Sequence, residues 1–325
     1  MTVFILSRQA LAVACGLLML GPLPAAAQGS YPAQPIRIVN AFPPGGPSDI
    51  ISRSVAEKMS AALKQPVVVD NKGGAGGNIA AAEVAKAAAD GYTVLTGIDT
   101  TFTVNPHIYD KLAFVPKDLK PLMVMASSGL LVGTHPALGV KTLPELVAKA
   151  KLQPLLFSSG SNGSPGHLAA AILTDATGAK ITHVPYKGNS PAVMAVLAGE
   201  VQAGVLATPG MLPHVRAGKI TALAVTGRQR SPMAPDLPTV AEAGLKALEL
   251  EVLYIAMVPA ATPEAVMAVL RKALGDALAQ PDVRAQLAQL DMVPEGLVGD
   301  DAARRLATQG ERFARIIKAT GMKIE

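Results

Sequence analysis

Residues 36–49 read IRIVNAFPPGGPSD, and this stretch sets the pattern for the first half of the chain. Residues 36–40 are a short, mostly β-branched run that predicts a strand. The FPPGG segment at 42–46 predicts a stiff, sharp turn, because proline and glycine are the strongest breakers of regular structure. Ser48 is the expected N-cap of an amphipathic helix that follows at once. The apolar face of that helix consists of Ile51, Val55, Met59 and Leu63.

The same order continues along the chain. Residues 67–69 (VVV) predict a second strand, and a glycine-rich loop at 70–78 leads into an alanine-rich helix at 79–89. Residues 92–96 predict a third strand. Short crossovers of this kind join parallel strands, because an antiparallel partner needs only a hairpin.

A second set of α/β units occupies the middle of the chain. The loop SSGSNGSPGH at 158–167 separates a predicted strand from a helix that Gly178 closes. Ser190 and Pro191 are the expected N-cap and first position of another helix, which ends near Gly199. The predicted strands are 155–157, 181–184 and 201–206, and the first helix is 168–177.

Two apolar, extended segments connect these units, with residues 129–134 leading out and 253–258 leading back. A chain that leaves one folded unit and returns to it later has the connectivity of a two-lobed protein with a cleft between the lobes. We expect the helical residues from about 263 to return to the first lobe. The expected fold is α/β, each lobe a mainly parallel sheet flanked by helices, with residues 31–130 and 256–325 in lobe 1 and residues 131–255 in lobe 2.

The N-terminal segment is typical of a secretory signal peptide. Residues 7–9 are weakly basic, residues 10–20 are apolar, and Ala25–Ala27 form a small-residue cleavage site, so we expect residues 1–27 to be removed. Cys15 leaves a lipoprotein anchor as the alternative, which the apolar residues on both sides of it disfavour. The processed chain then contains no cysteine, and its stability must come from its core.

The composition excludes several classes of function. The net charge of +5 is small and dispersed, and no basic run is interleaved with aromatic residues, so nucleic acid is not an expected partner. Tryptophan is absent, which disfavours sugar-stacking platforms. No Gly-x-Ser-x-Gly elbow, His-Glu-x-x-His motif or metal-spaced cluster occurs, so we expect no catalytic residues, no metal and no cofactor.

Two loops have the composition of an anion-binding site. In the first, Pro43 and Pro44 stiffen the backbone, Gly45 and Gly46 expose it, and Ser48 opens a helix whose N-terminus favours negative charge. In the second, serine and asparagine side chains offer donors and glycines allow close approach. Two such loops that face across a cleft could hold a molecule with an acid group at each end. The candidates in the second loop are Ser158, Ser159, Ser161, Asn162 and Ser164, with Gly160, Gly163 and Gly166.

Individual side chains near these loops are further candidates. His167 lies in the first turn of its helix, where it could donate to an anion or simply bond the local backbone. Asp49 is expected to fix the first loop. The Tyr186 hydroxyl could reach the cleft from the end of its strand, whereas His183 is the more structural member of that segment.

At this point the motifs resemble those of the Bug family, the extracytoplasmic solute-binding receptors of tripartite tricarboxylate transporters. They follow the family order through almost the whole processed chain. The resemblance rests on residues 31–39, 42–49 from Phe42 to Asp49, GGAGGN at 73–78 ending in Asn78, 91–93, 160–168, HVPYKG at 183–188 and PDLPTVAEAG at 235–244.

The resemblance implies a periplasmic, two-lobed binding protein of the type II class with a small carboxylate ligand. It adds Phe42 and Asn78 to the candidate ligand-binding residues. It also implies a large and a small integral-membrane subunit as partners, with the receptor itself expected to be a monomer. Two alternatives share this sequence: a hydrolase or transferase that uses the same cleft, and a ligand sensor for a two-component kinase.

One departure from the family pattern bears on the ligand. Where many members have a Phe-Asp pair and a following Asn, this chain has Leu206-Ala207-Thr208-Pro209. An ammonium group on the ligand would lack its carboxylate partner, and burying an unpaired charge is unfavourable by several kcal/mol. The Thr208 hydroxyl could still bond a carboxylate. We therefore expect a ligand without a free amine: a di- or tricarboxylate, a hydroxy acid or an aromatic acid.

Overall fold

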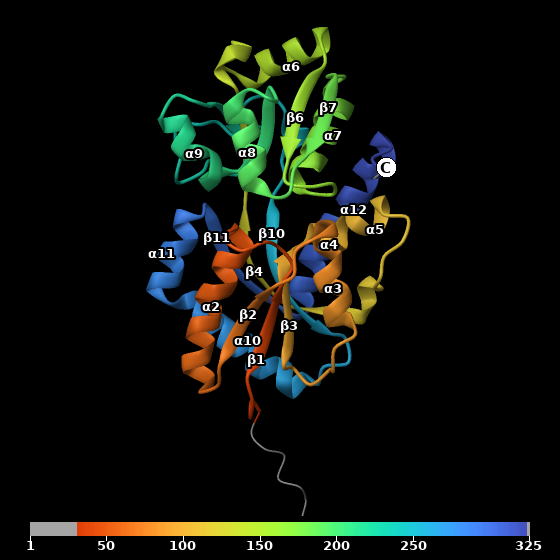
Figure 1. The fold of residues 1–325 in the computed structure, drawn as a ribbon, viewed down its shortest axis with the longest axis vertical. Helices are drawn as coiled ribbons and strands as arrows, with labels where there is room; N and C mark the ends of the chain where they lie inside the picture. The colour runs from red at the N-terminus through yellow and green to blue at the C-terminus, as the bar shows by residue number, and fades with distance from the viewer. Residues whose placement is uncertain (1–30, 324–325) are drawn as a thin grey trace, which may run out of the picture. The chain divides into compact units, whose positions relative to one another are not determined.

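The computed structural model describes residues 31–323, so the expected signal peptide at 1–27 lies outside the described residues. Two β-sheets, each with its own helices, make up the described chain (Figure 1). From Gln34 onward the chain forms one compact unit. We call the six-stranded sheet with its helices lobe 1 and the five-stranded sheet with its helices lobe 2.

The lobe 1 sheet combines parallel and antiparallel strands. Its strands are β1 (Ile36–Asn40), β2 (Val67–Asn71), β3 (Thr93–Ile98), β4 (Leu119–Ser128), β10 (Val252–Pro259) and β11 (Met292–Val298). They lie in the order β11-β4-β10-β3-β1-β2. β1 is parallel to β2 and β3, with Ile36 opposite Val67 and Arg37 opposite Thr93. β10 is antiparallel to β3 and β4, and β11 is antiparallel to β4.

Helices cover both faces of this sheet. α2 (Pro47–Leu63) contacts α10 (Glu264–Ala279) and α11 (Pro281–Gln289) on one face. α3 (Asn78–Ala85) and the start of α12 (Gly299–Thr320) share a hydrophobic core on the other. Two short helices, α4 (Thr100–Thr103) and α5 (Asn105–Ile108), follow β3. Buried alanines in α3 allow this helix to lie close to the sheet, which explains the alanine-rich sequence.

Lobe 2 is built in the same way. Its strands are β5 (Leu130–Thr134), β6 (Leu155–Ser159), β7 (Ile181–Pro185), β8 (Ala203–Ala207) and β9 (Thr221–Val225), in the order β7-β6-β8-β5-β9. β6 is parallel to β7 and β8, and β5 is antiparallel to β8 and β9. Its helices are α6 (Leu143–Leu152), α7 (Pro165–Thr177), α8 (Asn189–Ala198) and α9 (Thr208–Arg216).

A separate core holds this lobe together. Buried residues of α8, Leu131 of β5 and Met211 of α9 belong to one hydrophobic cluster. On the other side α7 packs against β6, β7 and β8 and also contacts α12. The C-terminal helix therefore touches both lobes, although the sequence predicts only a return to lobe 1.

The structure corrects the expectation of mainly parallel sheets, since both sheets are mixed. The strands of the βαβ units are parallel as predicted, and the connecting segments supply antiparallel strands. β4 and β5 carry the chain out of lobe 1, and β10 carries it back. These connecting strands lie inside the sheets, so each completes its backbone hydrogen bonds with a neighbouring strand on both sides.

Helix starts also differ from the prediction. α2 begins at Pro47 with Gly46 as its N-cap, so Ser48 is not the cap. α8 begins at Asn189 with Gly188 as its N-cap, so Ser190 is inside the helix. Both caps are glycines that follow a turn, and Gly188 has φ +111°, which disfavours other residues. No helix among residues 31–323 is long and apolar enough to cross a membrane.

Candidate functional site

A pocket of about 500 Å³ lies between the two lobes. Lobe 1 contributes the turn after β1, and lobe 2 contributes the loops after β6, β7 and β8. We call it the interlobe pocket. All four of these strands end at the pocket with their carboxyl ends, which is where open α/β sheets bind ligands.

Four helices begin at this pocket. α2, α7, α8 and α9 each place residues of their first turn or their cap in its lining. The first N–H groups of a helix have no partner inside the helix, and each N-terminus carries about half a positive charge. The lining residues at these starts are Gly46, Pro47 and Ser48; Ser164, Pro165 and Gly166; Gly188, Asn189 and Ser190; Ala207, Pro209 and Gly210.

The lobe 1 turn has backbone N–H groups that are bonded within the turn and others that are not. The Gly45 N–H donates to Asp49 Oδ2 at 2.9 Å, so it is occupied within the turn. The Gly46 carbonyl accepts from the N–H groups of Asp49 and Ile50. The N–H groups of Gly46 and Ser48 donate no hydrogen bond to any of residues 31–323. These two donors are therefore the ones that an anion in the pocket could use.

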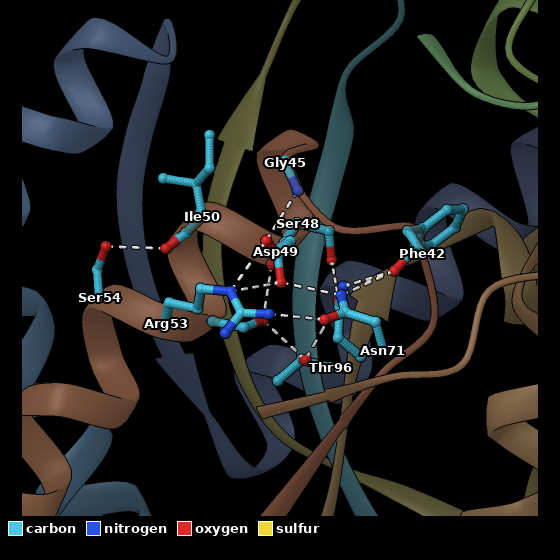
Figure 2. Close-up of polar contacts among 11 residues, drawn as sticks. Phe42, Gly45, Ser48, Asp49, Ile50, Arg53, Ser54, Asn71 and Thr96 are labelled. Atoms are coloured by element: carbon cyan, nitrogen blue, oxygen red, sulfur yellow. Dashed lines mark hydrogen bonds and ion pairs between the residues drawn. The ribbon is translucent and has the colours of Figure 1, made fainter. Parts of the chain in front are cut away.

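Asp49 fixes this turn, as the sequence predicts (Figure 2). Its carboxylate accepts from the Gly45 N–H, from Asn71 Nδ2 at 2.9 Å and from Arg53 Nε at 2.9 Å. Burial alone would raise the pKa of Asp49, but the hydrogen bonds from Arg53, Gly45 and Asn71 outweigh it and lower the pKa below its ordinary value. The Asp49 carboxylate thus makes its hydrogen bonds within lobe 1, and Asp49 is not among the residues that line the pocket.

Ser48 differs from its predicted role as a donor to the ligand. Its hydroxyl donates to Asn40 Oδ1 at 2.7 Å, away from any pocket acceptor. Asn40 Nδ2 and Asn71 Nδ2 each donate to the Phe42 carbonyl at 3.0 Å. Sequence reasoning missed both asparagines as supports of the turn. The signal available was their place as the last residue of adjacent strands.

In lobe 2, the serine-rich loop is also held by its own side chains. Ser159 Oγ contacts the Ser161 carbonyl at 3.0 Å and His183 Nε2 at 2.5 Å. Ser164 is the N-cap of α7 and accepts from the His167 N–H. A Cβ at Gly166 would lie 2.6 Å from the Val205 carbonyl oxygen, so only glycine lets α7 start this close to β8.

His167 and His183, two of the histidines of this lobe, form a neutral stacked pair. Their rings lie 3.8 Å apart and nearly parallel. Burial lowers the pKa of His167 to about 4, and burial with the neighbouring His167 lowers the pKa of His183 to about 3. His167 Nδ1 accepts from the Gly163 N–H at 3.2 Å. His167 therefore supports the loop, which is the structural alternative raised from the sequence, and does not line the pocket.

The start of α8 is a pocket element that sequence reasoning missed, whereas the start of α9 was a candidate through Thr208. Asn189 Oδ1 accepts from the Ala207 N–H at 3.0 Å and ties the two helix starts together. A Cβ at Gly210 would lie 2.5 Å from Asn189 Nδ2, so glycine is required beside this side chain. The sequence signal was the pair of Gly-Asn-Ser-Pro and Thr-Pro-Gly segments, each directly after a strand.

The lining combines one cationic side chain with polar and apolar ones. Lys187 is the only charged side chain among the described lining residues, and no Asp or Glu lines the pocket. Tyr254 contributes its ring, because its hydroxyl contacts Ser128 Oγ at 3.3 Å and burial raises its pKa to about 12. The apolar lining consists of Phe42, Ile98, Leu130, Val205, Leu206, Val252 and Leu290.

The predicted site residues divide into two groups. Those that line the pocket are Phe42, Pro44, Gly45, Gly46, Ser48 and Ser161, and those outside the lining are Asp49, Asn78, Ser159, Asn162, Gly163, His167, Tyr186 and Thr208. Tyr186 directs its hydroxyl to Glu200 Oε2 at 3.5 Å, which corrects the expectation that it reaches the cleft. Thr208 is fully buried at the start of α9, whereas its neighbour Ala207 lines the pocket.

Asn78 and Gly163 both lie against Asn105, at a contact between the lobes. Asn78 Oδ1 accepts from Asn105 Nδ2 at 2.7 Å at the start of α5. A Cβ at Gly163 would lie 2.6 Å from Asn105 Oδ1 and 2.9 Å from Ile108 Cδ1. The serine-rich loop therefore packs directly on α5 of lobe 1.

Within residues 31–323, no group of three or more His, Cys, Asp or Glu side chains could hold a metal ion.

Comparison with known proteins identifies the fold and the family. The sequence model of the tripartite tricarboxylate transporter family receptor matches residues 51–322. The chain belongs to this family of solute-binding receptors. BugT of Bordetella pertussis (strain Tohama I) is 33% identical over 300 residues, which are 91% of this chain and 92% of BugT.

Solved structures of this receptor family have the same two-lobed fold. The periplasmic binding protein BugD, at 30% identity, superposes with a TM-score of 0.81 over 91% of this chain and all of BugD. An R. palustris protein solved with adipate, at 31% identity, has a TM-score of 0.84 over 90% of this chain and 99% of its own. The receptor family is one of binding proteins rather than enzymes, which removes the hydrolase and transferase alternative.

Proposed function

We propose that this protein is a periplasmic receptor that captures a small carboxylate in the interlobe pocket. It then delivers the acid to the large and small integral-membrane subunits of a tripartite tricarboxylate-type transporter. The observation that carries the proposal is the convergence of four helix N-termini on a pocket lined by one lysine and no acidic residue. Such a pocket favours an anion from every side. The adipate in the R. palustris relative supports a carboxylate.

The ligand contacts follow from the donors that remain available. In lobe 1 the N–H groups of Gly46 and Ser48 hold one carboxylate, and Phe42 and Pro44 form the adjoining wall. In lobe 2 the hydroxyl of Ser161 and the starts of α7 and α8 face the same space. Supporting residues keep these donors in place without touching the ligand: Asp49, Asn78, Ser159, Asn162, Gly163, His167 and Thr208.

Binding is coupled to closure of the two lobes. Lobe 1 comprises residues 31–130 and 256–325 and lobe 2 residues 131–255, with the strands between them acting as the hinge. Each lobe supplies half of the donors, so only the closed form satisfies both ends of a ligand. The receptor acts as a monomer, and the acid is a di- or tricarboxylate, a hydroxy acid or an aromatic acid without an amine.

A thermal-shift screen with calorimetry tests this function directly. Purified protein is heated with straight-chain diacids, citrate, malate, benzoate-type acids, and the amino acids aspartate and glutamate. We expect at least one amine-free acid to raise the melting temperature and to be recovered unchanged by mass spectrometry. If no carboxylate shifts the melting temperature, or if the acid is chemically converted, the proposed function is wrong.

A further inference from the structure

We infer that Lys187 selects for a second carboxylate on the ligand, so that the preferred ligand is a diacid with an apolar, amine-free middle. This inference rests on the proposed function and narrows it. Lys187 belongs to the turn between β7 and α8, in lobe 2. The lobe 1 donors at Gly46 and Ser48 are backbone groups, so the two lobes offer different chemistry to the two ends of a ligand.

Lys187 is available to a ligand. It lines the interlobe pocket and is exposed there. It makes no ion pair with any of residues 31–323, whereas arginines elsewhere in the described chain are paired. An ammonium without an acidic partner at the edge of an anion pocket is free to bind a ligand carboxylate through a charge-assisted hydrogen bond.

The lining gives no partner to a positive group on the ligand. With Lys187 as its one charged residue and four helix starts around it, the pocket has a positive potential throughout. A ligand ammonium would be repelled by this potential and would lose its hydration without a carboxylate to replace it. An amino acid therefore binds less well than the diacid of the same carbon number.

Apolar side chains occupy the lining between the polar ends. Ile98 comes from lobe 1 and Val205 from lobe 2, and Leu130 and Val252 are the first residues of β5 and β10, the strands that join the lobes. Methylene groups in contact with them are stabilised by burial, whereas a hydroxyl in the same place loses its bonds to water. An unsubstituted chain between two carboxylates fits this arrangement of polar ends and apolar walls.

The test compares acids that differ only in the second carboxylate. Straight-chain diacids of four to eight carbons are screened by calorimetry, and the best is paired with the monoacid of the same carbon number, for example adipate with hexanoate. We expect Lys187→Met to weaken binding of the diacid about tenfold, the size of a charge-assisted hydrogen bond, and to weaken the monoacid less than about threefold. Lys187→Arg keeps the charge and should retain most of the diacid affinity.

The matched control is Lys219→Met, which removes an exposed lysine of lobe 2 outside the pocket lining. It should leave both acids unchanged. Salt provides a second readout, because the preference of the wild type for the diacid should fall as ionic strength rises and should be nearly flat in Lys187→Met.

The possible outcomes separate this inference from the proposed function. Equal losses for the diacid and the monoacid in Lys187→Met, or no loss at all, would show that Lys187 is a solvated lysine and would overturn the inference. Binding of citrate, malate or an aromatic acid with no binding of any straight-chain diacid would also overturn it, while the receptor function stands. Only a protein that binds no carboxylate would contradict both.

Discussion

Ser48 and Ala207 show how single residues define this site. Ser48 contributes its backbone N–H to the pocket, while its hydroxyl is bound to Asn40. Ala207 lines the pocket at the start of α9, where a carboxylate would face the ligand. The Ser48 hydroxyl is therefore no guide to which ligand binds. The lack of a carboxylate at position 207 is a better guide, because that residue lines the pocket.

We expect Ala207→Asp to change the class of ligand. The new carboxylate would pair with a ligand ammonium, so 2-aminoadipate or glutamate should bind where the wild type does not bind them. It would also repel a second ligand carboxylate and weaken diacid binding about tenfold, since a nearby like charge is unfavourable by roughly 1–2 kcal/mol. Calorimetry with the amino acids and with the diacids measures both changes in affinity.

Ala217→Asp is the control, because it adds the same charge just past the far end of α9, outside the pocket lining. It should leave every affinity unchanged. An Ala207→Asp protein that is folded and still binds only amine-free acids would refute the importance of the missing carboxylate.

At the scale of elements, two contacts join the lobes beside the pocket. The loop before α7 packs on α5, where Gly163 leaves no room for a side chain. On another side, Ser231 Oγ of the loop after β9 donates to Asp291 Oδ1 of the turn before β11 at 2.5 Å. Each of these contacts places a residue of one lobe directly against a residue of the other.

We expect Gly163→Ala to hinder closure. Its Cβ would lie 2.6 Å from Asn105 Oδ1 and 2.9 Å from Ile108 Cδ1, so either these side chains move or the two lobes stay further apart. Ligand affinity should fall at least about fivefold, because closure is what brings both sets of donors to the ligand. Small-angle scattering with ligand should show a larger radius of gyration than for the wild type.

Gly139→Ala separates steric blockage from backbone strain. Gly139 has φ +71° and Gly163 has φ +73°, so alanine is strained by a similar amount, about 1 kcal/mol, at either place. Nothing lies within 4 Å of a Cβ at Gly139. If both variants lose the same affinity, the contact with α5 has no role in closure.

A buried carboxylate links three further elements. Asp99, after β3, accepts from the Leu253 N–H of β10 at 3.0 Å and from Gln309 Nε2 of α12 at 2.6 Å. Burial raises its pKa to about 6, although these hydrogen bonds act against the shift. The folded protein therefore holds a proton on this group more tightly than the unfolded chain does.

This shift predicts the direction of a pH effect. Since the folded pKa is above the unfolded value of about 3.8, the stability due to this group falls as pH rises from about 4 to about 6, and it is constant above that. Asp99→Asn should remove that part of the pH dependence. The readout is the free energy of unfolding of wild type minus variant, from urea titrations at pH 4 and 7. A difference that does not change with pH would show that Asp99 has an ordinary pKa.

At the scale of the whole molecule, local pattern predicts some parts of the fold and not others. The βαβ units and the two extended connections are visible in the sequence because each is a short run with its own turn signals. β11 was missed, since Pro294 and Gly296 interrupt its pattern inside a segment that reads as helical. The antiparallel pairs of lobe 1 join strands more than a hundred residues apart, and no local pattern specifies them.

The candidate site, like the fold, could be predicted only in part from local sequence patterns. Gly46 and Ser161 follow from loop composition, because loops after strands reach the ligand side of a parallel sheet. Lys187 and Asn189 could not be predicted as pocket residues from the sequence, because a single lysine or asparagine has no sequence pattern that marks it. Their role depends on where β7 ends relative to β1 in the other lobe.

The measurement that tests the account most directly is a crystal structure of the protein with the amine-free acid that binds best in the screen. The central claim is that helix starts from both lobes hold a carboxylate in the interlobe pocket. We expect one carboxylate of the acid within about 3 Å of the N–H groups of Gly46 and Ser48, and its other end beside the starts of α7 and α8. An acid bound outside this pocket, or held in it with neither N–H group in contact, would contradict the account.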